Sequence, residues 1–357
     1  MTGVQRYAYE ITLALDAIFA QEHGLCRRLP MRLVLPPRTE IKPPLATIDT
    51  EATSFGSGHL WDQLVLPAHA GAGVLSLANF GPLLKKQQIV CIHDANVFIE
   101  PQSYSEAFGL AYRTLLPLVG WRARRIATVS RFSMDMLVKY GVCREEKIFV
   151  AANGHEHALK WNANRAQAPV LKVLTRPYVL LLGSRAKHKN IEVVLRQAEA
   201  LDAAGIDIVV VGATSSIFST GHPGIRRSNI HYAGYVNDDD LAALYEGAIC
   251  LTFPSRTEGF GIPPLEAMAR GCPVVCSNVP SLAEVGGEAA VYVAPDDDEA
   301  WRVTILGLSR SDSQRAAMAA NGRKRAMLFS WKRSAQLYLE EMLKLSNAQS
   351  GRKAVRS

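Results

Sequence analysis

Residues 248–277 restrict the folds open to this 357-residue chain more than any other stretch. They begin with an apolar run at 248–253 that has no polar alternation, which indicates a buried strand. A glycine-containing loop follows, and the proline pair at 263–264 favours a helix start, because proline is tolerated where the amide would lack a partner anyway. Gly271 suits a left-handed cap behind that helix, and 272–276 begins another apolar strand. This order predicts a βαβ unit whose loop amides and helix N-terminus form an anion-binding site.

Two glutamates lie in this unit, Glu258 in the loop and Glu266 in the first helical turn, with seven residues between them. Two carboxylates cannot both hold a phosphate, because like charges repel. They can instead accept hydrogen bonds from the hydroxyls of a sugar and a ribose. The plainer alternative is that Glu266 caps its helix and Glu258 is a solvated loop acid. The surrounding glycine loop, proline pair and strands favour the hydroxyl-binding interpretation.

A second candidate segment, 183–190 (GSRAKHKN), lies between a buried strand at 178–182 and a helix. Arg185, Lys187 and Lys189 place three cations at the carboxyl end of a strand, where open α/β sheets bind ligands. A pyrophosphate at this loop would receive charge-assisted hydrogen bonds without needing a metal. An exposed basic turn that binds nothing is the alternative.

Strands and helices alternate twice along the chain, which predicts an α/β protein with two doubly wound parallel sheets. The length allows two domains, each with its own core. The periodicity lapses at 155–176, where we place the linker. The predicted parts are an N-terminal domain at 1–160, a C-terminal domain at 170–330, a final helix at 331–346 and a disordered polar tail at 347–357.

The chain opens on a glycine turn that leads directly into an amphipathic helix, whose apolar face runs from Val4 to Ile18 at helical spacing. In an α/β fold a glycine loop that feeds a helix normally follows a buried strand, but Met1 stands where that strand would end. We therefore expect the first strand of the N-terminal sheet to be missing from this sequence. Gly3 has no side chain, so the backbone of this turn can approach a phosphate.

The segment TEGFGIPPLEAMARGCPVV at 257–275 resembles the donor-binding signature of retaining GT-B glycosyltransferases of the family 4 type, and the likeness runs through nearly the whole chain. The resemblance implies two Rossmann-like domains that face each other across a cleft. In that arrangement the C-terminal domain binds a nucleotide-diphosphate sugar and the N-terminal domain binds the acceptor. The resemblance also implies that the final helix crosses back to the first domain and that the sugar is transferred with retention of configuration.

The resemblance assigns roles to residues at matching positions. His93 and Asp94 match a family dipeptide that faces the transferred sugar, although a lone histidine at a strand end is most often structural. Lys189 matches the phosphate-binding lysine, whereas Ser184 stands where the family often has its arginine and Arg185 comes one position later. The implied catalytic residues are Glu258, His93, Lys189 and Arg185, with Asp94 on the acceptor side. The implied donor-binding residues are Gly3, Ser184, Gly234, Tyr235, Val236, Gly259, Phe260, Gly261, Ile262 and Glu266.

The composition restricts the site chemistry and the compartment. No run of 18 apolar residues is present, so the sequence predicts no membrane span. Six dispersed cysteines are predicted to be small core residues in a reducing compartment. The sequence predicts no metal site, because the acidic runs at 238–240 and 296–298 are expected to cap helices. We expect that no cofactor is required and that the protein is cytoplasmic, with the inner face of the cell membrane as one place of action.

The net charge of +7 suits contact with anionic partners. Basic and aromatic residues gather on and near the helix predicted at 104–126, in the acceptor domain. They are Lys85, Lys86, Phe108, Tyr112, Arg113, Trp121, Arg122, Arg124 and Arg125. Such a helix can lie on an anionic membrane face or can be an ordinary solvated helix. Nucleic acid is disfavoured as a partner, because no recognised nucleic-acid-binding fold accompanies the basic residues.

The resemblance implies a retaining glycosyltransferase that moves a hexose from a nucleotide-diphosphate sugar to a saccharide or lipid-linked acceptor. Residues 59–133 resemble bacterial mannosyl- and rhamnosyltransferases of surface polysaccharide assembly, which favours mannose as the sugar and GDP-mannose as the donor. Two other functions stay open, a nucleotide-sugar epimerase on the same scaffold and a non-catalytic sugar-nucleotide-binding protein. The spacing of the two glutamates favours transfer, whereas the expected missing strand keeps the binding protein open.

Overall fold

The computed structural model describes residues 1–40, 42–183, 186–212 and 227–354. The chain divides into two compact units. The N-terminal unit consists of Met1–Phe98, Glu106–Gly154 and Ser330–Ser357, and the C-terminal unit consists of Ile99–Ser105 and His155–Phe329. Residues 155–160, which we expected in the first domain, therefore belong to the second unit. In the part of the chain that the structure describes, no helix is long and apolar enough to cross a membrane.

The C-terminal unit is built on a six-stranded sheet in the order β12-β11-β10-β7-β8-β9, in which every neighbouring pair is parallel. Its strands are β7 (Tyr178–Leu182), β8 (Asp207–Val211), β9 (Ile230–Gly234), β10 (Leu251–Phe253), β11 (Val274–Ser277) and β12 (Ala290–Val293). The strand order reverses between β7 and β10, which makes their carboxyl ends the place where an open α/β sheet binds ligands. The predicted doubly wound sheet is confirmed for this unit.

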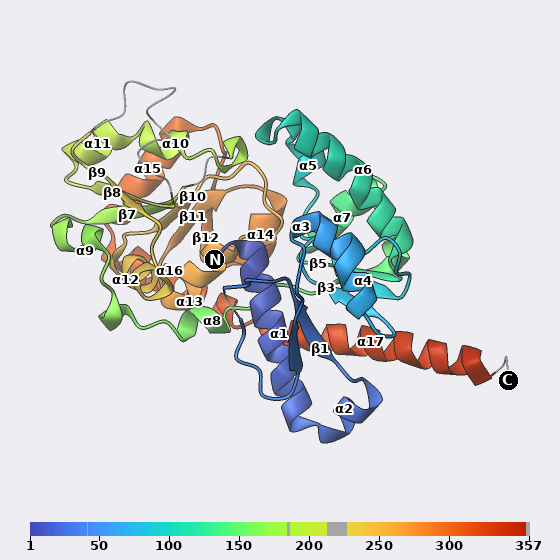
Figure 1. Cartoon of the computed structure of the whole chain (residues 1–357). Helices are drawn as coiled ribbons and strands as arrows, with labels where there is room; N and C mark the ends of the chain where they lie inside the picture. Colours follow the sequence, from blue (N-terminus) through green and yellow to red (C-terminus); the bar gives the residue numbers. More distant parts are fainter. Residues whose placement is uncertain (41, 184–185, 213–226, 355–357) are drawn as a thin grey trace. The chain divides into compact units, whose positions relative to one another are not determined.

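Helices cover both faces of this sheet (Figure 1). They are α8 (Glu156–Leu159), α9 (Pro169–Val173), α10 (Glu192–Leu195), α11 (Ala198–Ala203), α12 (Asp238–Gly247), α13 (Ile262–Arg270), α14 (Pro280–Gly286), α15 (Asp298–Ser309) and α16 (Asp312–Ala326). Short 3-10 turns are η2 (Pro101–Ser103), η4 (Ala163–Arg165), η5 (Lys187–Lys189) and η7 (Gly287–Ala289). Apolar residues of α10, α11 and α15 pack on one face of the sheet around the fully buried Trp301. Burial of these side chains from water is what fixes the sheet and its strand ends.

The N-terminal unit contains a four-stranded parallel sheet in the order β3-β4-β5-β6 and a separate parallel pair, β1-β2. The strands are β1 (Arg32–Leu35), β2 (Asp49–Ala52), β3 (Val74–Ser76), β4 (Gln88–Cys91), β5 (Arg125–Thr128) and β6 (Ile148–Val150). The sequence did not predict β2, whose residues DTEA are mostly polar. The first element of the chain is helix α1 (Gly3–Gln21), which begins at a capping box formed by Thr2 and Gln5. The expected missing strand stays a prediction.

The helices of the N-terminal unit include two, α2 and α5, that the sequence did not predict. The helical elements of this unit are α1, α2 (His23–Arg28), α3 (Gly58–Leu60), the π-turn η1 (Trp61–Val65), α4 (Leu66–His69), α5 (Asn96–Ile99), α6 (Glu106–Arg122), α7 (Arg131–Lys139), the 3-10 turn η3 (Glu145–Lys147) and α17 (Trp331–Ala354). The sequence predicts a short helix at 58–67, and the π-helical segment η1 interrupts it between α3 and α4. Proline inside a helix predicts a kink or break at Pro117, but α6 continues through this residue, and Leu116 and Val119 beside it are buried in the core. Helix α17 extends past residue 345, into the tail that we expected to be disordered.

Helix α17 packs against α1 inside the N-terminal unit. The hydroxyl of Tyr7 on α1 donates to the carbonyl oxygen of Ala151 at 2.9 Å and lies 2.9 Å from the hydroxyl of Tyr338 on α17. Both tyrosines are fully buried, and burial raises the pKa of each phenol well above its ordinary value. The two hydroxyls therefore stay protonated and act as hydrogen-bond donors that hold the last helix on the first.

Gly120 of α6 leads to a stability prediction, because a Cβ at this position would lie 1.9 Å from the carbonyl oxygen of Val142. The obstacle is backbone, so no side-chain rotation can relieve it. We expect Gly120→Ala to lower the free energy of unfolding of the N-terminal unit by about 3 kcal/mol, measured by urea unfolding. Gly109→Ala on the same helix is the matched control, since its Cβ would meet only the end of the Arg113 side chain at 3.8 Å. Equal effects of the two changes would contradict the prediction.

Candidate functional site

The loop between β10 and α13 has the conformation that the sequence predicted. Gly261 precedes the helix with φ at +111°, and α13 then begins with prolines in its first turn. Gly271 follows the helix in the left-handed conformation, with φ at +77°. A Cβ at Gly261 would lie 2.6 Å from the side chain of Leu282, so the position requires glycine for its backbone angle and for space. The βαβ unit predicted from residues 248–277 is confirmed.

Lys189 and Glu258 form an ion pair at the carboxyl ends of β7 and β10. The Lys189 Nζ atom lies 2.6 Å from Glu258 Oε1, and the two side chains are 25% and 11% exposed. The ammonium group also lies 5.6 Å from the centre of the Phe253 ring. The pair is partly shielded from water, so its electrostatic interactions are stronger than those of a surface pair. Sequence reasoning selected both residues, and the structure brings them into direct contact.

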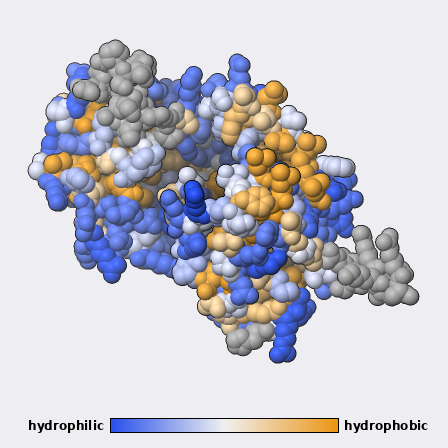
Figure 2. Space-filling model, in the orientation of Figure 1, coloured by the Kyte–Doolittle hydropathy of each residue, from blue (hydrophilic) through white to orange (hydrophobic). Residues whose placement is uncertain are grey.

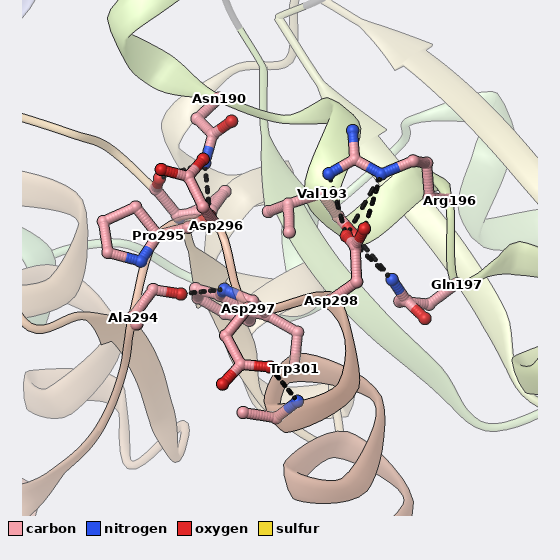
Figure 3. A network of polar contacts seen from close by, with 12 residues as sticks. Asn190, Val193, Arg196, Gln197, Ala294, Pro295, Asp296, Asp297, Asp298 and Trp301 are labelled. Carbon is pink, nitrogen blue, oxygen red and sulfur yellow. Dashed lines mark hydrogen bonds and ion pairs between the residues drawn. The ribbon is translucent and has the colours of Figure 1, made fainter.

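Asn190 fixes the loop that carries Lys189. It adopts a left-handed backbone conformation with φ at 50°, which asparagine tolerates better than most residues. Its Nδ2 atom donates to the carbonyl oxygens of Pro295 at 2.7 Å and Pro254 at 3.2 Å, and Figure 3 shows the first of these bonds. Arg256 donates to Asn190 Oδ1 at 3.2 Å. Asn190 thus joins the loop after β7 to the segments that follow β10 and β12, a role that the sequence analysis missed.

The acidic runs have structural partners. Asp297 Oδ1 accepts from the amide of Ala300 at 2.9 Å and caps α15, while Asp298 pairs with Arg196 at 2.8 Å (Figure 3). Asp296 pairs with Arg256, and Asp240 belongs to the capping box of α12. The prediction that these runs cap helices is confirmed for Asp240 and Asp297, whereas Asp296 and Asp298 form ion pairs instead. Among the described residues, no three His, Cys, Asp or Glu side chains are arranged to hold a metal ion.

Glu266 is buried and has a protein partner at each carboxylate oxygen. His157 Nε2 lies 2.9 Å from Oε1, and the hydroxyl of Tyr245 donates to Oε2 at 3.2 Å. Because a carboxylate only accepts, His157 must carry its proton on Nε2. Burial and the neighbouring Glu266 raise the pKa of Tyr245 well above its ordinary value, so this phenol stays a donor. The alternative that Glu266 caps its helix is wrong, because its oxygens are bound by these two side chains.

His157 is the site residue that the sequence analysis missed most clearly. It lies on α8, inside the segment that we had interpreted as a linker. Arg270 at the end of α13 donates to the carbonyl oxygens of Ala158 and Trp161, each at 3.2 Å, and so ties α8 to the helix that carries Glu266. His157 and Glu266 are 109 positions apart in the sequence, so no local pattern predicts the hydrogen bond between them.

The candidate site lies in the C-terminal unit, and the sequence of this unit matches a known family. The family model described as glycosyl transferases group 1 matches residues 163–325. The O-antigen chain mannosyltransferase B of Escherichia coli is 30% identical over 256 residues, which cover 69% of this chain and 67% of that protein. The chain belongs to the glycosyl transferases group 1 family. A second relative, the O-antigen chain mannosyltransferase RfbU of Salmonella typhimurium, is 31% identical over 232 residues, and the match spans 62% of its length and 64% of this chain.

Solved structures place this group 1 glycosyltransferase in the GT-B fold. A sucrose-phosphate synthase from Thermosynechococcus elongatus superposes with a TM-score of 0.72 at 20% identity, covering 97% of this chain and 94% of that one. WaaG, a glycosyltransferase involved in lipopolysaccharide biosynthesis, superposes with a TM-score of 0.69 at 18% identity, covering 94% of this chain and 96% of that one. The predicted fold class, α/β with two Rossmann-like domains of GT-B type, is confirmed.

Other residues predicted to bind the donor lie at neighbouring strand ends of the same sheet. Gly234 ends β9 with φ at +67°, and the side chain of Tyr235 after it is 89% exposed. Phe260 is buried, and its ring lies 5.6 Å from that of Phe329 in an edge contact. Gly259 and Ile262 flank Phe260 and Gly261, and Val236 follows Tyr235. Ser184 and Arg185 lie outside the described residues.

His188, beside Lys189, is buried. Burial, reinforced by the Lys189 charge, lowers the pKa of its imidazole below the ordinary value. Its Nδ1 atom has no hydrogen-bond partner among the described residues. Its peptide group is fixed on both sides, because its N–H donates to Ser103 Oγ at 3.2 Å and its carbonyl oxygen accepts from the Arg256 amide at 2.7 Å. The imidazole is therefore neutral at pH 7, and Lys189 supplies the charge at this position.

His93, Asp94 and Gly3 lie in the N-terminal unit, and their polar groups have local partners. The ring atom Nε2 of His93 lies 2.9 Å from the carbonyl oxygen of Leu77. The backbone N–H of His93 donates to Asn79 Oδ1 at 2.8 Å. Asp94 Oδ1 accepts from the amide of Asn96 at 2.8 Å. Gly3 is the first residue of α1. These bonds favour the structural interpretation of His93, and its predicted contact with the transferred sugar stays a prediction.

Proposed function

We propose that this protein is a retaining glycosyltransferase that moves a mannosyl residue from a nucleotide-diphosphate sugar to a saccharide or lipid-linked acceptor in surface polysaccharide synthesis. The observation that carries the proposal is the Lys189–Glu258 pair beside the Gly261 turn, at the strand ends where such a sheet binds ligands. The names of two relatives, both O-antigen chain mannosyltransferases, support mannose as the sugar. GDP-mannose is the proposed donor.

Lys189 would act on the leaving diphosphate. When the bond between the anomeric carbon and the diphosphate oxygen breaks, negative charge grows on that oxygen. An ammonium group has three N–H donors, so Lys189 can keep its bond to Glu258 and still donate to a phosphate oxygen. The amides of Phe260 and Gly261 and the side chain of Arg185 would add further donors. Such fixed donors stabilise the transition state because they need no reorganisation as the charge develops.

The two glutamates would hold the sugar and the ribose. The ion pair with Lys189 uses one Glu258 oxygen, which leaves acceptor capacity for hydroxyls of the transferred sugar. Among the described residues, Glu266 has one hydrogen-bond partner at each oxygen, and the second lone pair of each oxygen could accept from ribose hydroxyls. No resident metal or cofactor enters this proposal, because Lys189 and the amides supply the positive charge.

The proposal is tested with purified protein, nucleotide sugars and an acceptor. We expect GDP-mannose to release its nucleotide diphosphate only when a saccharide or lipid-linked acceptor is present, and the new linkage to have the donor's anomeric configuration by NMR. A changed sugar without release would make the protein an epimerase. Binding of the nucleotide sugar without either reaction would make it a binding protein. Either of these two results, or an inverted product, would overturn the proposal.

His157 provides a prediction within this function, as a positioning residue for Glu266. We expect His157→Leu to raise the KM for the donor about 10-fold with kcat changed less, because Glu266 loses the partner that orients it toward the ribose. His157→Gln, which can still donate to Glu266 Oε1, should recover most of the affinity. A purely structural role would lower the melting temperature and kcat of both variants without this division between KM and kcat.

We also propose that the reaction takes place in the cytoplasm, at the inner face of the cell membrane. A lipid-linked acceptor would be presented at that face. Cell fractionation tests the location. We expect part of the protein to sediment with the membranes and to be released by high salt. A protein found only in the soluble fraction would contradict membrane contact.

A further inference from the structure

Two of the places where the chain passes from one unit to the other are joined by hydrogen bonds. These crossings lie between residues 154 and 155 and between residues 329 and 330. The carbonyl oxygen of Phe329 accepts from the backbone N–H of His155 at 3.3 Å and lies 2.7 Å from His155 Nδ1. Because a carbonyl oxygen only accepts, His155 must carry its proton on Nδ1. His155 is buried, so both bonds are shielded from water and fix the backbone of Phe329.

The side chain of Phe329 reaches the candidate donor site. Its ring lies 5.6 Å from the ring of Phe260 at an interplanar angle of 83°, which is the edge-to-face arrangement that aromatic pairs prefer. Phe260 is 4% exposed and stands between Glu258 and Gly261 in the loop before α13. A buried ring restricts the backbone that carries it. The contact with Phe329 therefore constrains the direction in which the amides of Phe260 and Gly261 point.

Arg325 of α16 connects Phe329 to a second support of the same turn. Its guanidinium carbon lies 5.2 Å from the centre of the Phe329 ring. The same guanidinium donates to the carbonyl oxygen of Val285 in α14 at 2.9 Å. Helix α14 also carries Leu282, the side chain that adjoins Gly261. The turn at residues 260–261 is thus held by the Phe329 ring and by α14, and Arg325 joins these two supports.

The helix after the turn has a support of its own. Helix α12 packs beside α13, and the buried Tyr245 of α12 donates to Glu266 of α13 at 3.2 Å. Figure 2 shows mainly hydrophilic side chains on the outer surface over α12, as expected of a helix with one buried face. Helix α13 is therefore held by a contact apart from Phe329. Loss of the Phe329 ring should disturb the turn and leave Glu266 in place.

We propose that Phe329 and His155 are positioning residues, which aim the amides of Phe260 and Gly261 at the outer phosphate of the leaving diphosphate. The inference rests on the proposed transferase function. The outer phosphate carries the oxygen that is released from the anomeric carbon, so the growing negative charge appears there. Amides stabilise this charge best when they already point at it before the bond breaks. Phe329 acts through the Phe260 ring, and His155 acts through the backbone of Phe329.

Titration calorimetry of the full chain with GDP and with GMP tests the proposal. Phe329→Ala should weaken GDP binding at least about 5-fold and GMP binding less than about twofold, because only GDP carries the outer phosphate. His155→Leu should act in the same direction. His155→Asn, whose amide can still donate to the carbonyl oxygen of Phe329, should recover most of the GDP affinity. The matched control is Leu328→Ala, an adjacent apolar residue that is 60% exposed, which should leave both affinities unchanged.

A second measurement needs no nucleotide. Hydrogen–deuterium exchange of the peptide that covers residues 254–262 should become faster in Phe329→Ala than in the wild-type protein, and should not change in Leu328→Ala. Equal weakening of GDP and GMP binding would assign Phe329 to the general stability of the unit and would overturn the inference, as would unchanged exchange in Phe329→Ala. Failure of the wild-type protein to bind GDP would instead count against the proposed donor. The two failures are therefore distinguishable.

Discussion

Replacement of Glu258 with glutamine is expected to lower kcat by about 10²-fold or more while the variant still folds. Positive charge develops on the sugar ring as the bond to the diphosphate breaks, and a carboxylate at the ring stabilises that charge. Glutamine keeps the size and one acceptor oxygen of Glu258 but removes the negative charge. The expected loss is therefore one of turnover rather than donor binding. Steady-state kinetics with the nucleotide sugar and acceptor, with titration calorimetry for donor affinity, measures both quantities.

The ion pair decides which variant is informative. Glutamine can still accept from Lys189 Nζ, so Glu258→Gln should change the free energy of unfolding by less than about 1 kcal/mol. Glu258→Ala leaves the partly buried ammonium without a partner and should cost about 1–3 kcal/mol. Glu199→Gln, in an exposed pair with Arg227 of the same unit, is the control and should change neither turnover nor stability. Full turnover in Glu258→Gln would assign the residue to structure alone.

Local sequence patterns were sufficient for the strands of the C-terminal unit, although they missed α8 and α9 in the segment interpreted as a linker. Strand β7 is an uninterrupted apolar run, and β8 is apolar after its first residue, Asp207. Helix α13 is bounded by prolines and a glycine with distinct backbone requirements. These signals depend on neighbouring residues, so they can be recognised in one sequence. Strand β2 carries mostly polar residues and is defined by its pairing with β1, which no local pattern reports. It was missed for that reason.

The contacts of the site could be predicted only in part. Lys189 and Glu258 were chosen separately because each follows a strand, but their sequence separation of 69 hid that they form a pair. His157 was missed because its partner Glu266 is 109 residues away and its own helix has only four residues. Asn190 gave a weak signal, since asparagine tolerates the left-handed conformation, but its bonds to Pro254 and Pro295 depend on the assembled sheet. Long-range contacts of this kind require the fold.

The second large effect is expected at Lys189. Lys189→Met should lower kcat by about 10²–10³-fold and weaken binding of the nucleotide diphosphate product, because the cation that faces the leaving group is lost. Methionine keeps the aliphatic chain over the Phe253 ring, so the change removes mainly the charge. Lys187→Met in the same turn is the matched control. The Lys187 side chain is exposed. Loss of its charge weakens only the summed electrostatic field of the loop, so Lys187→Met should lower kcat by less than about threefold.

The double variant Lys189→Met with Glu258→Gln distinguishes a working pair from two separate groups. If each residue acts on its own part of the donor, the two losses in kcat multiply. If Glu258 mainly orients Lys189, kcat of the double variant should be no lower than that of Lys189→Met alone, because the ammonium group that Glu258 orients is already absent. The 2.6 Å contact and the shared shielding from water favour a loss smaller than the product. Equal losses in Lys187→Met and Lys189→Met would instead mean that the loop acts only through its summed charge, and the assignment of Lys189 to the leaving diphosphate would be wrong.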